Sequence, residues 1–494
     1  DHGARNGAGL PVDGYLDGHD PGADLPRLAA MVPRIPALDA PRTMASPSRP
    51  VPRIAPVRRA WPLRPPDSFF LHVQTRSITQ QVGAVITVEP EAGAAPLTGA
   101  VLRQRLVERL PVMVTLRRRL VPRGDWRRPG WVAETTVDVD EHLSDVTVRD
   151  EDGVRAAVDW FWSRPLSLRR PPWELMLVRQ EGSDIATLCF KMHHAIGDGL
   201  SMVGTLDRLM DLPDEPPGAP DRETSRRGSS LRRVASLTGK VARGMWELGW
   251  HAAAPTNPLN RELTPNQRGV LTVPLPTGPV REAAHAHQVR TSELMLGVVA
   301  DALRRAGVVG GPGEPTFLRT MLPVAMPGRT GGRIAGNLTG AVSINLPVGP
   351  MSVLERVHAI RRDLHRRIEL GEPHAAAFVM RALGMFPAPV HGWMAARVYN
   401  SQFFNMIASY VPGPRTVRRI AGNRFRAVYP VGALAEGVPL GVGIMRNADV
   451  TGVCVLFDES LRSAVQPLPE AIRASFAELL PDAEMVPDDA ARST

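Results

Sequence analysis

The chain has few of the residues that mark several common classes of protein. It contains two cysteines, Cys189 and Cys454, among 494 residues, which argues against a disulfide framework and favours a reducing cytoplasm. No stretch of 18 or more uncharged apolar residues is present, so no membrane-spanning helix is expected. A basic start followed by an apolar core and a small-residue cleavage site is also missing, so export is not expected.

Aromatic residues are scarce as well, at 5% of the chain. Neither zinc-finger spacing nor a basic zipper accompanies the net charge of +9, so nucleic acid is the least favoured partner. The charge is mainly due to arginine, and it indicates either a solvated basic surface or an anionic partner such as lipid or a phosphate-bearing cofactor. The 48 prolines and 44 glycines predict many turns and some irregular linkers.

The length and patterning of the chain predict two folded units. A chain of 494 residues is too long for one ordinary core, and its 43% hydrophobic content can fill two. We expect a Pro/Arg-rich disordered arm, a first unit, a polar linker with a basic amphipathic helix, and a second unit. Their ranges are 1–65, 66–215, 216–262 and 263–485.

Both units mix strand-like alternation with helical spacing, which indicates an α/β fold. Strands are expected at 80–90, 131–143, 316–324, 340–348, 438–445 and 451–458. Helices are expected at 97–110 and 352–368, and the second opens with Ser352 and Glu355 in capping-box spacing.

Two further stretches are candidates for contact with a lipid surface. Residues 231–248 have one apolar helical face, with arginine and lysine lying away from it, and residues 378–398 combine Met, Phe and Trp with few charges. A basic amphipathic helix can lie on a membrane surface, or it can pack against its own domain. Peripheral association with lipid is the expectation, and core packing is the alternative.

Two adjacent histidines stand out in the segment Lys-Met-His-His-Ala-Ile-Gly-Asp-Gly at 191–199. Apolar alternation before His193 predicts a buried strand, and apolar residues at helical spacing after Gly199 predict a helix. The histidines therefore lie in a loop held by rigid elements, where functional groups are often found. A purely structural interpretation is also open, with Asp198 capping the helix and Gly199 allowing a tight turn.

The residues of this loop allow two chemical interpretations, a metal site and a general base. A zinc site needs three or four convergent ligands, and no His-Glu-x-x-His helix or cysteine pair is present. A neutral imidazole can instead accept a proton from a hydroxyl or thiol near pH 7. Since no Gly-x-Ser-x-Gly elbow is present, we expect the histidine to activate a nucleophile of the substrate, without a covalent intermediate and without a metal.

These residues resemble a known superfamily. His193, His194, Asp198 and Gly199 match the HHxxxDG motif of CoA-dependent acyltransferases. Further landmarks resemble the bacterial wax ester synthase/diacylglycerol acyltransferase family. They are Ser163–Leu166, Arg170–Glu174, Gly336-Asn337 followed by Leu346-Pro347, Val411–Pro414 and Gly422. The resemblance covers roughly residues 66 to 480.

The resemblance implies two chloramphenicol-acetyltransferase-like domains, each a mixed sheet with helices, with an active-site tunnel between them. It implies that His194 is the general base, that Asp198 is the structural partner of the loop, and that His193 and Gly199 are supporting residues. Acyl-CoA would be the co-substrate, with no permanently bound cofactor. The first acceptor would be diacylglycerol, giving triacylglycerol, and the second a long-chain alcohol, giving wax ester.

Several positions depart from the family pattern. Ser292 and Glu293 stand where the family usually has Asn-Asp, and together with Asn337 they are candidates for substrate binding, although the pair could simply cap its helix. Tyr410 replaces an asparagine before Val-Pro-Gly-Pro, and Ser167 replaces an aspartate. These departures leave the choice of acceptor open.

Two other functions remain as alternatives. One is a condensation or polyketide-associated acyltransferase that takes its acyl group from a carrier protein, and the other is a catalytically silent lipid-binding homologue. The intact His194 and Asp198 argue against the second.

The expected location is the cytoplasm, in peripheral contact with a membrane or lipid droplets, and the sequence leaves the oligomeric state open.

Overall fold

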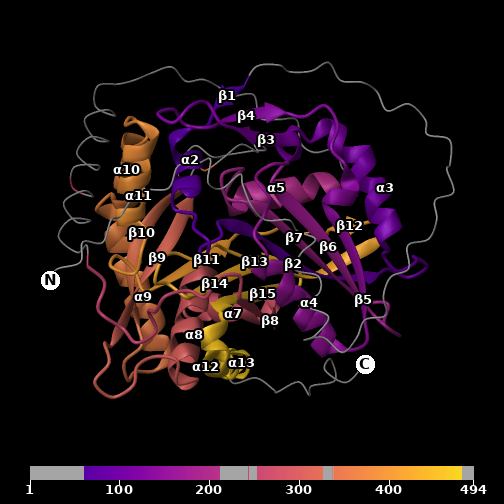
Figure 1. Ribbon diagram of the computed structural model, residues 1–494. Coiled ribbons are helices and arrows are strands. Elements are labelled where there is room, and N and C mark those ends of the chain that lie inside the picture. The colour runs from indigo at the N-terminus through magenta and orange to yellow at the C-terminus, as the bar shows by residue number, and fades with distance from the viewer. Residues whose placement is uncertain are drawn as a thin grey trace, which may run out of the picture.

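The computed structural model describes residues 60–211, 243, 253–325, 337, 339–414 and 416–480. Two six-stranded mixed sheets form the centre of this part of the chain, with helices packed against them (Figure 1). A smaller sheet joins β1 (Trp61–Pro62), β4 (Gly130–Ala133) and β3 (Arg118–Val121) in that order. The α/β class with two sheet-containing halves, expected from the sequence, is confirmed.

The first sheet carries the histidine loop. Its strands are, in spatial order, β12 (Arg419–Ile420), β13 (Asn423–Val431), β2 (Gln81–Pro90), β7 (Ala186–His193), β6 (Trp173–Gln180) and β5 (Leu143–Val148). The helices of this half are α2 (Pro65–His72), α3 (Gly99–Arg109), α4 (Glu151–Ser163) and α5 (Gly199–Leu209), with 3₁₀ turns at Leu110–Val112, Val114–Arg117 and Val139–Glu141. β5 and β6 are parallel, and the other pairs are antiparallel.

The second sheet lies beside the first. Its strands are, in spatial order, β10 (Thr339–Pro347), β9 (Phe317–Ala325), β11 (Met406–Val411), β14 (Leu440–Asn447), β15 (Val450–Asp458) and β8 (Arg268–Pro276). Its helices are α7 (Thr277–Ala286), α8 (Thr291–Arg305), α9 (Val353–Glu369), α10 (Glu372–Leu383), α11 (Ala388–Val398), α12 (Arg462–Val465) and α13 (Leu468–Ala477), with a 3₁₀ turn at Glu459–Leu461. β11 is parallel to both of its neighbours.

Two strands of the first sheet come from the second half of the sequence. After β11 the chain leaves the second sheet, forms β12 and β13 at the edge of the first, and returns as β14. β13 pairs with β2 from Asn423 opposite Pro90 to Val431 opposite Gly83. The two halves are therefore joined by a shared sheet, an exchange that the expected division at 263 does not contain.

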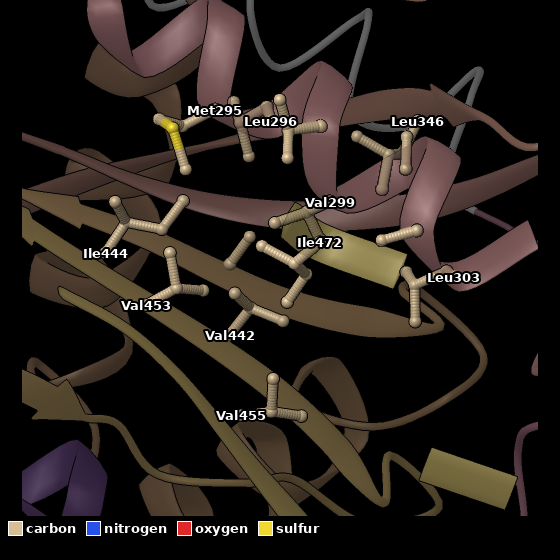
Figure 2. Close-up of a cluster of buried hydrophobic side chains, with 14 of the residues drawn as sticks. Met295, Leu296, Val299, Leu303, Leu346, Val442, Ile444, Val453, Val455 and Ile472 are labelled. Atoms are coloured by element: carbon tan, nitrogen blue, oxygen red, sulfur yellow. The ribbon is translucent and has the colours of Figure 1, made fainter. Parts of the chain in front are cut away.

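The core of the second half is packed between α8 and the second sheet. Eleven of the 15 residues of α8 are buried, as expected for a helix that is apolar around most of its circumference. Figure 2 shows its Leu296 and Val299 above Val442 of β14 and Val453 of β15, with Ile472 of α13 completing the layer. The sheet that forms one wall of the site thus rests on a rigid, close-packed support.

Most of the elements expected from the sequence are confirmed. Ser352 caps α9, and the carboxylate of Glu355 accepts a hydrogen bond from the Ser352 N–H at 2.8 Å. The single strand expected at 131–143 is wrong, because β4 ends at Ala133 and β5 begins at Leu143. In between, Asp138 Oδ1 accepts the Asp140 N–H at 3.0 Å, and such local side-chain bonds compete with strand formation.

Some expectations fall on the ends and linker of the chain. The arm expected at 1–65 lies mostly outside the described residues, although Trp61 and Pro62 form β1 and Leu63 is buried. The amphipathic helix expected at 231–248 lies outside them as well, apart from Arg243. Across the described ranges, no helix combines the length and apolarity needed to cross a membrane.

Gly413 in the Val-Pro-Gly-Pro landmark offers a test of the packing beside the site. A Cβ atom added there would lie 1.9 Å from the carbonyl oxygen of Arg446, in β14. We expect Gly413→Ala to lower the free energy of unfolding by about 1–3 kcal/mol. In the control Gly278→Ala, on α7, the added Cβ meets nothing within 4 Å, so stability should stay level or rise by up to about 1 kcal/mol. Denaturant unfolding measures both, and equal effects would contradict the described contact.

Candidate active site

The histidine loop joins the end of β7 to the start of α5. Its backbone is held from two other segments, because the His193 N–H donates to Pro172 O at 2.9 Å and the His194 N–H donates to Gln80 O at 2.7 Å. A bond from the Ile196 N–H to His193 O at 2.9 Å closes the turn. The strand–loop–helix arrangement predicted from the sequence is therefore confirmed.

Both ring nitrogens of His193 form hydrogen bonds that stabilise the loop. Its Nδ1 accepts the Ala195 N–H at 3.0 Å, so its proton lies on Nε2, which donates to Gln74 Oε1 at 2.6 Å. Burial lowers the pKa of His193 to about 3, with a smaller contribution from His194. Both ring nitrogens are thus occupied by partners within the protein, and the ring stays neutral near pH 7.

His194 is placed differently from its neighbour. Its ring stacks on Phe70, with centroids 3.6 Å apart and an interplanar angle of 7°, and it lines the large cavity described below. Its Nδ1 has no hydrogen-bond partner among the described residues. Burial lowers the pKa of His194, while the negative charge of Asp198 opposes that shift. A neutral imidazole beside a cavity can accept a proton from a bound group.

Asp198 caps α5. Its Oδ1 accepts hydrogen bonds from the backbone N–H and from the hydroxyl of Ser201, both at 3.1 Å. The capping role predicted from the sequence is confirmed. Gly199 opens the helix and packs beside Val411 of β11 at the cavity wall, where an added Cβ would lie 3.3 Å from a Val411 methyl group.

A cavity of about 570 Å³ adjoins His194 between the two sheets. Its walls come from both halves of the sequence, namely from α2, β2 and α5 and from β9, β10, β11, β13, α9, α10 and α11. Most of the lining side chains are apolar, and Tyr410 is among the lining residues. A long aliphatic chain fits the character of such a wall.

Asn337 connects the second half to the histidine loop. Its Nδ2 donates to the backbone oxygen of His194 at 2.8 Å and to Asp67 Oδ1 at 3.1 Å, and its N–H donates to the same carboxylate oxygen at 2.9 Å. Asp67 and Phe70 lie on α2, so one short helix holds both Asn337 and the ring of His194. In the sequence this segment marked only the start of the fold, and the signal it offered was an aspartate close to a pair of phenylalanines.

Ser292 and Glu293 lie elsewhere in the second half, at the start of α8. The Glu293 carboxylate accepts the Arg290 N–H at 2.9 Å and lies 2.9 Å from His365 Nε2. Neither Ser292 nor Glu293 is among the cavity-lining residues. The Glu293 carboxylate thus caps α8 with one oxygen and contacts His365 of α9 with the other.

Lys191 is fully buried. It contacts both sequence landmarks that precede the loop, Ser163–Leu166 and Arg170–Glu174. Its ammonium group donates to the carbonyl oxygens of Phe161 at 2.7 Å and Arg164 at 2.8 Å, and lies 3.2 Å from the Glu174 carboxylate. Burial lowers the pKa of Lys191 to about 8. These contacts fasten α4 and β6 to β7, two residues before the histidine pair.

No group of three or more His, Cys, Asp or Glu side chains in the described ranges is placed to hold a metal ion.

A two-sheet α/β fold with an HHxxxDG loop at a cavity between the halves defines a class that includes acyltransferases and condensation domains. A wax ester synthase/diacylglycerol acyltransferase from Marinobacter aquaeolei VT8 shares this fold, with a TM-score of 0.62 and 21% identity over 85% of this chain and 98% of that one. The first condensation domain of the CDA synthetase shares it with a TM-score of 0.57 and 16% identity, over 87% and 98%.

The family itself is shown by two family models. The wax ester synthase/diacylglycerol acyltransferase catalytic domain matches residues 63–291, and the C-terminal domain of the same family matches 335–480. The chain belongs to this family of acyltransferases. A Mycobacterium tuberculosis relative, "Probable diacyglycerol O-acyltransferase tgs2", is 24% identical over 78% of this chain and 91% of its own length. Another relative from this organism, "Probable diacyglycerol O-acyltransferase tgs1", is 23% identical over 84% of this chain and 94% of its own length.

The two histidines should respond differently to substitution. We expect His194→Ala to reduce acyl transfer by about 10²–10⁴-fold, the usual loss when a general base is removed, with little change in the unfolding midpoint. His193→Ala should lower the midpoint, because it removes the partner of Ala195 and Gln74, and it should reduce turnover less. The measurements are kcat and thermal unfolding of both variants. Near-wild-type turnover in folded His194→Ala would contradict the assignment of His194 as the general base.

The pH profile tests the protonation state of His194. Because burial lowers its pKa from the ordinary value of 6.5, the base stays neutral at pH 7. We expect kcat/KM to remain level from pH 8 down to 6.5 and to fall only below that value, as the ring becomes protonated. Steady-state kinetics from pH 8 to well below 6.5 measure both the level region and the acid limb.

Folding must be followed across the same pH range as a control. His193 has a pKa of about 3 in the folded protein and 6.5 as its ordinary value. Between these values the unfolded chain binds a proton that the folded protein does not, so the free energy of unfolding decreases as the pH falls. Loss of kcat/KM above pH 6.5 in fully folded protein would contradict a base with a lowered pKa.

Proposed function

We propose that the protein transfers a long-chain acyl group from acyl-CoA to the hydroxyl of a lipid acceptor, with His194 as general base. The observation that carries this proposal is a neutral histidine at the wall of a mostly apolar cavity of about 570 Å³. Family membership supports the reaction type, and the apolar wall supports a long-chain substrate. Acyl-CoA is the co-substrate, and no permanently bound cofactor is proposed.

The proposed reaction is a single direct transfer. His194 removes the proton from the acceptor hydroxyl while its oxygen attacks the thioester carbonyl carbon. The tetrahedral intermediate collapses as the carbon–sulfur bond breaks, and the imidazolium returns its proton to the CoA sulfur. Asp198 supports this cycle electrostatically because its negative charge favours the imidazolium, and the apolar lining keeps water from competing as the acceptor.

Diacylglycerol is the first proposed acceptor, giving triacylglycerol, and a long-chain alcohol is the second, giving wax ester. The names of the mycobacterial relatives favour the first, and the name of the Marinobacter structure includes both. A substrate-binding role for Asn337 is supported by its position against His194. The contacts of Glu293 with Arg290 and His365 favour a supporting role for Glu293 and the adjacent Ser292, through α8.

Work at a lipid surface, from the cytoplasm, is part of the proposal. α10, α11 and the turn between them expose several apolar side chains, including Phe378, Phe386, Met385 and Trp393, the last two 78% and 53% exposed. Arg397 stacks on Trp393, 4.6 Å from the ring centroid. Aromatic rings next to arginine are suited to the boundary between headgroups and acyl chains. Peripheral association with a membrane or lipid droplets would give an insoluble acceptor access to the cavity.

A carrier-protein donor is the second candidate, and the structural likeness to condensation domains favours it. Those domains share the fold at 16% identity, whereas both family models that match this chain describe wax ester synthase/diacylglycerol acyltransferases. A catalytically silent lipid-binding homologue is the third. The intact HHxxxDG loop and its open cavity argue against this one.

One assay separates these functions. Purified protein is incubated with labelled palmitoyl-CoA and either diacylglycerol or hexadecanol, and in parallel with palmitoyl-carrier protein, and the labelled lipids are resolved. We expect label in triacylglycerol, less label in wax ester, and both only with the CoA donor. The control is His194→Ala, which should yield about 10²–10⁴-fold less product. Transfer from the carrier protein alone would favour the condensation alternative, and binding without transfer would favour the silent homologue.

A further inference from the structure

The cavity has one polar end, which the proposed chemistry does not use. Its lining includes Arg319 of β9, Ser343 of β10, Arg367 of α9 and Glu372 of α10, in an otherwise mostly apolar wall. Arg367 and Glu372 are 2% and 1% exposed. Charged groups buried this deeply at the end of a chain-binding cavity call for a specific ligand or partner.

Much of the hydrogen-bonding capacity of Arg367 and Glu372 is already used within the protein. Arg367 Nε donates to both carboxylate oxygens of Asp363 at 3.0 Å, and Nη1 donates to Glu372 Oε2 at 3.2 Å. Glu372 Oε1 accepts the Ser343 N–H at 2.9 Å. Arg367 Nη2 has no acceptor among the described residues. A buried donor without an acceptor is unfavourable, so an oxygen supplied by a ligand would stabilise it.

The charged side chains at this end favour an uncharged ligand over an anion. The two buried guanidinium groups, Arg319 and Arg367, face two carboxylates, Asp363 and Glu372, and a third arginine, Arg366, has a half-exposed side chain that pairs with Asp363 at 3.3 Å. A carboxylate or phosphate at Arg367 would lie beside the two acids with which Arg367 is already paired and would be repelled by them. A hydroxyl group can instead accept a hydrogen bond from Arg367 and donate one to Glu372.

The register of the sheet places this end far from His194. Val411 packs beside Gly199 in the histidine loop, and five residues earlier on β11, Met406 lies opposite Thr320 of β9, next to Arg319. Five to six strand residues correspond to roughly 16–20 Å. An extended long-chain acyl group with its thioester at His194 covers a distance of this order, and its last carbons would reach Arg367.

We propose that Arg367 and Glu372 bind a hydroxyl group at the distal end of the donor's acyl chain. The substrate class is therefore a long-chain acyl-CoA that carries a terminal or near-terminal hydroxyl. A chain ending in methyl would leave Arg367 Nη2 buried without an acceptor. The inference rests on the proposed function only in placing the thioester at His194.

The direct test is binding of two unreactive thioethers, S-hexadecyl-CoA and S-(16-hydroxyhexadecyl)-CoA, measured by calorimetry on the full chain. We expect the hydroxylated ligand to bind at least about 10-fold more tightly, the usual effect of satisfying one buried donor. The kinetic counterpart is the kcat/KM ratio of 16-hydroxyhexadecanoyl-CoA to palmitoyl-CoA. A parallel arm compares 1,16-hexadecanediol with hexadecanol as acceptor, with palmitoyl-CoA as donor.

Variants identify the site. Arg367→Met should abolish the preference for the hydroxylated donor. Arg367→Lys keeps the positive charge but lacks the planar guanidinium group with its several N–H donors, so it should reduce the preference. The matched control is Arg356→Met. Arg356 is also buried and pairs with Asp301 at 3.2 Å, but it does not line the cavity. It should lower stability and leave the preference intact, and Arg367→Lys carries the test if Arg367→Met fails to fold.

Each outcome decides one point. Equal affinity for the two thioethers in wild-type protein, or an unchanged preference in both Arg367 variants, would overturn the inference. A preference for the diol with none for the hydroxylated donor would overturn the assignment to the acyl chain. Absence of transfer from either donor would contradict the proposed function, while the thioether affinities would still decide whether the hydroxyl site exists.

Discussion

The pairing of β13 with β2 is the interaction on which the rest of the structure depends. It places a strand from the second half of the sequence in the sheet that carries the histidine loop (Figure 1). Side chains on both faces of β13 are buried, with Phe425 and Val428 in one core cluster and Ala427 and Tyr429 in another. Since the chain enters from β11 and leaves into β14, the two sheets cannot move apart without breaking this pairing. The cavity between them therefore has fixed walls.

The adjacent histidines illustrate how contacts divide one residue type into two functions. His193 has partners for both ring nitrogens within the protein, and burial keeps it neutral at any pH near 7. His194 stacks on Phe70 and lines the cavity, so its ring can meet a substrate. The alternation of β7 sends the His193 side chain into the protein, and the loop that begins at His194 turns the next side chain toward the cavity. Adjacent positions at the end of a strand can thus supply a support and a base.

Much of the fold followed from local patterns. The capping box at Ser352, the cap at Asp198 and most strands were predictable because they depend on residues within a few positions of one another. The expectation failed at 131–143, where Asp138 replaces strand pairing with a side-chain bond, and alternation alone carries no information about that competition. The role of α2 was also missed, because Asp67 and Phe70 acquire it only through contact with Asn337, some 270 residues later, and with His194.

The sequence by itself determined the class of fold, the histidine loop and the family, since each depends on residue type and short spacing. The tertiary structure decided which histidine faces the cavity, where Glu293 lies and what closes the far end of the cavity. It placed Glu293 in a helix cap, and it brought Arg319, Arg367 and Glu372 together from three separate elements. The physical reason is that pairing and packing act between residues far apart in the chain. The spacing of residues along the sequence does not indicate how deeply a side chain is buried or which groups it contacts. Burial and contacts determine its protonation state and whether it can meet a substrate.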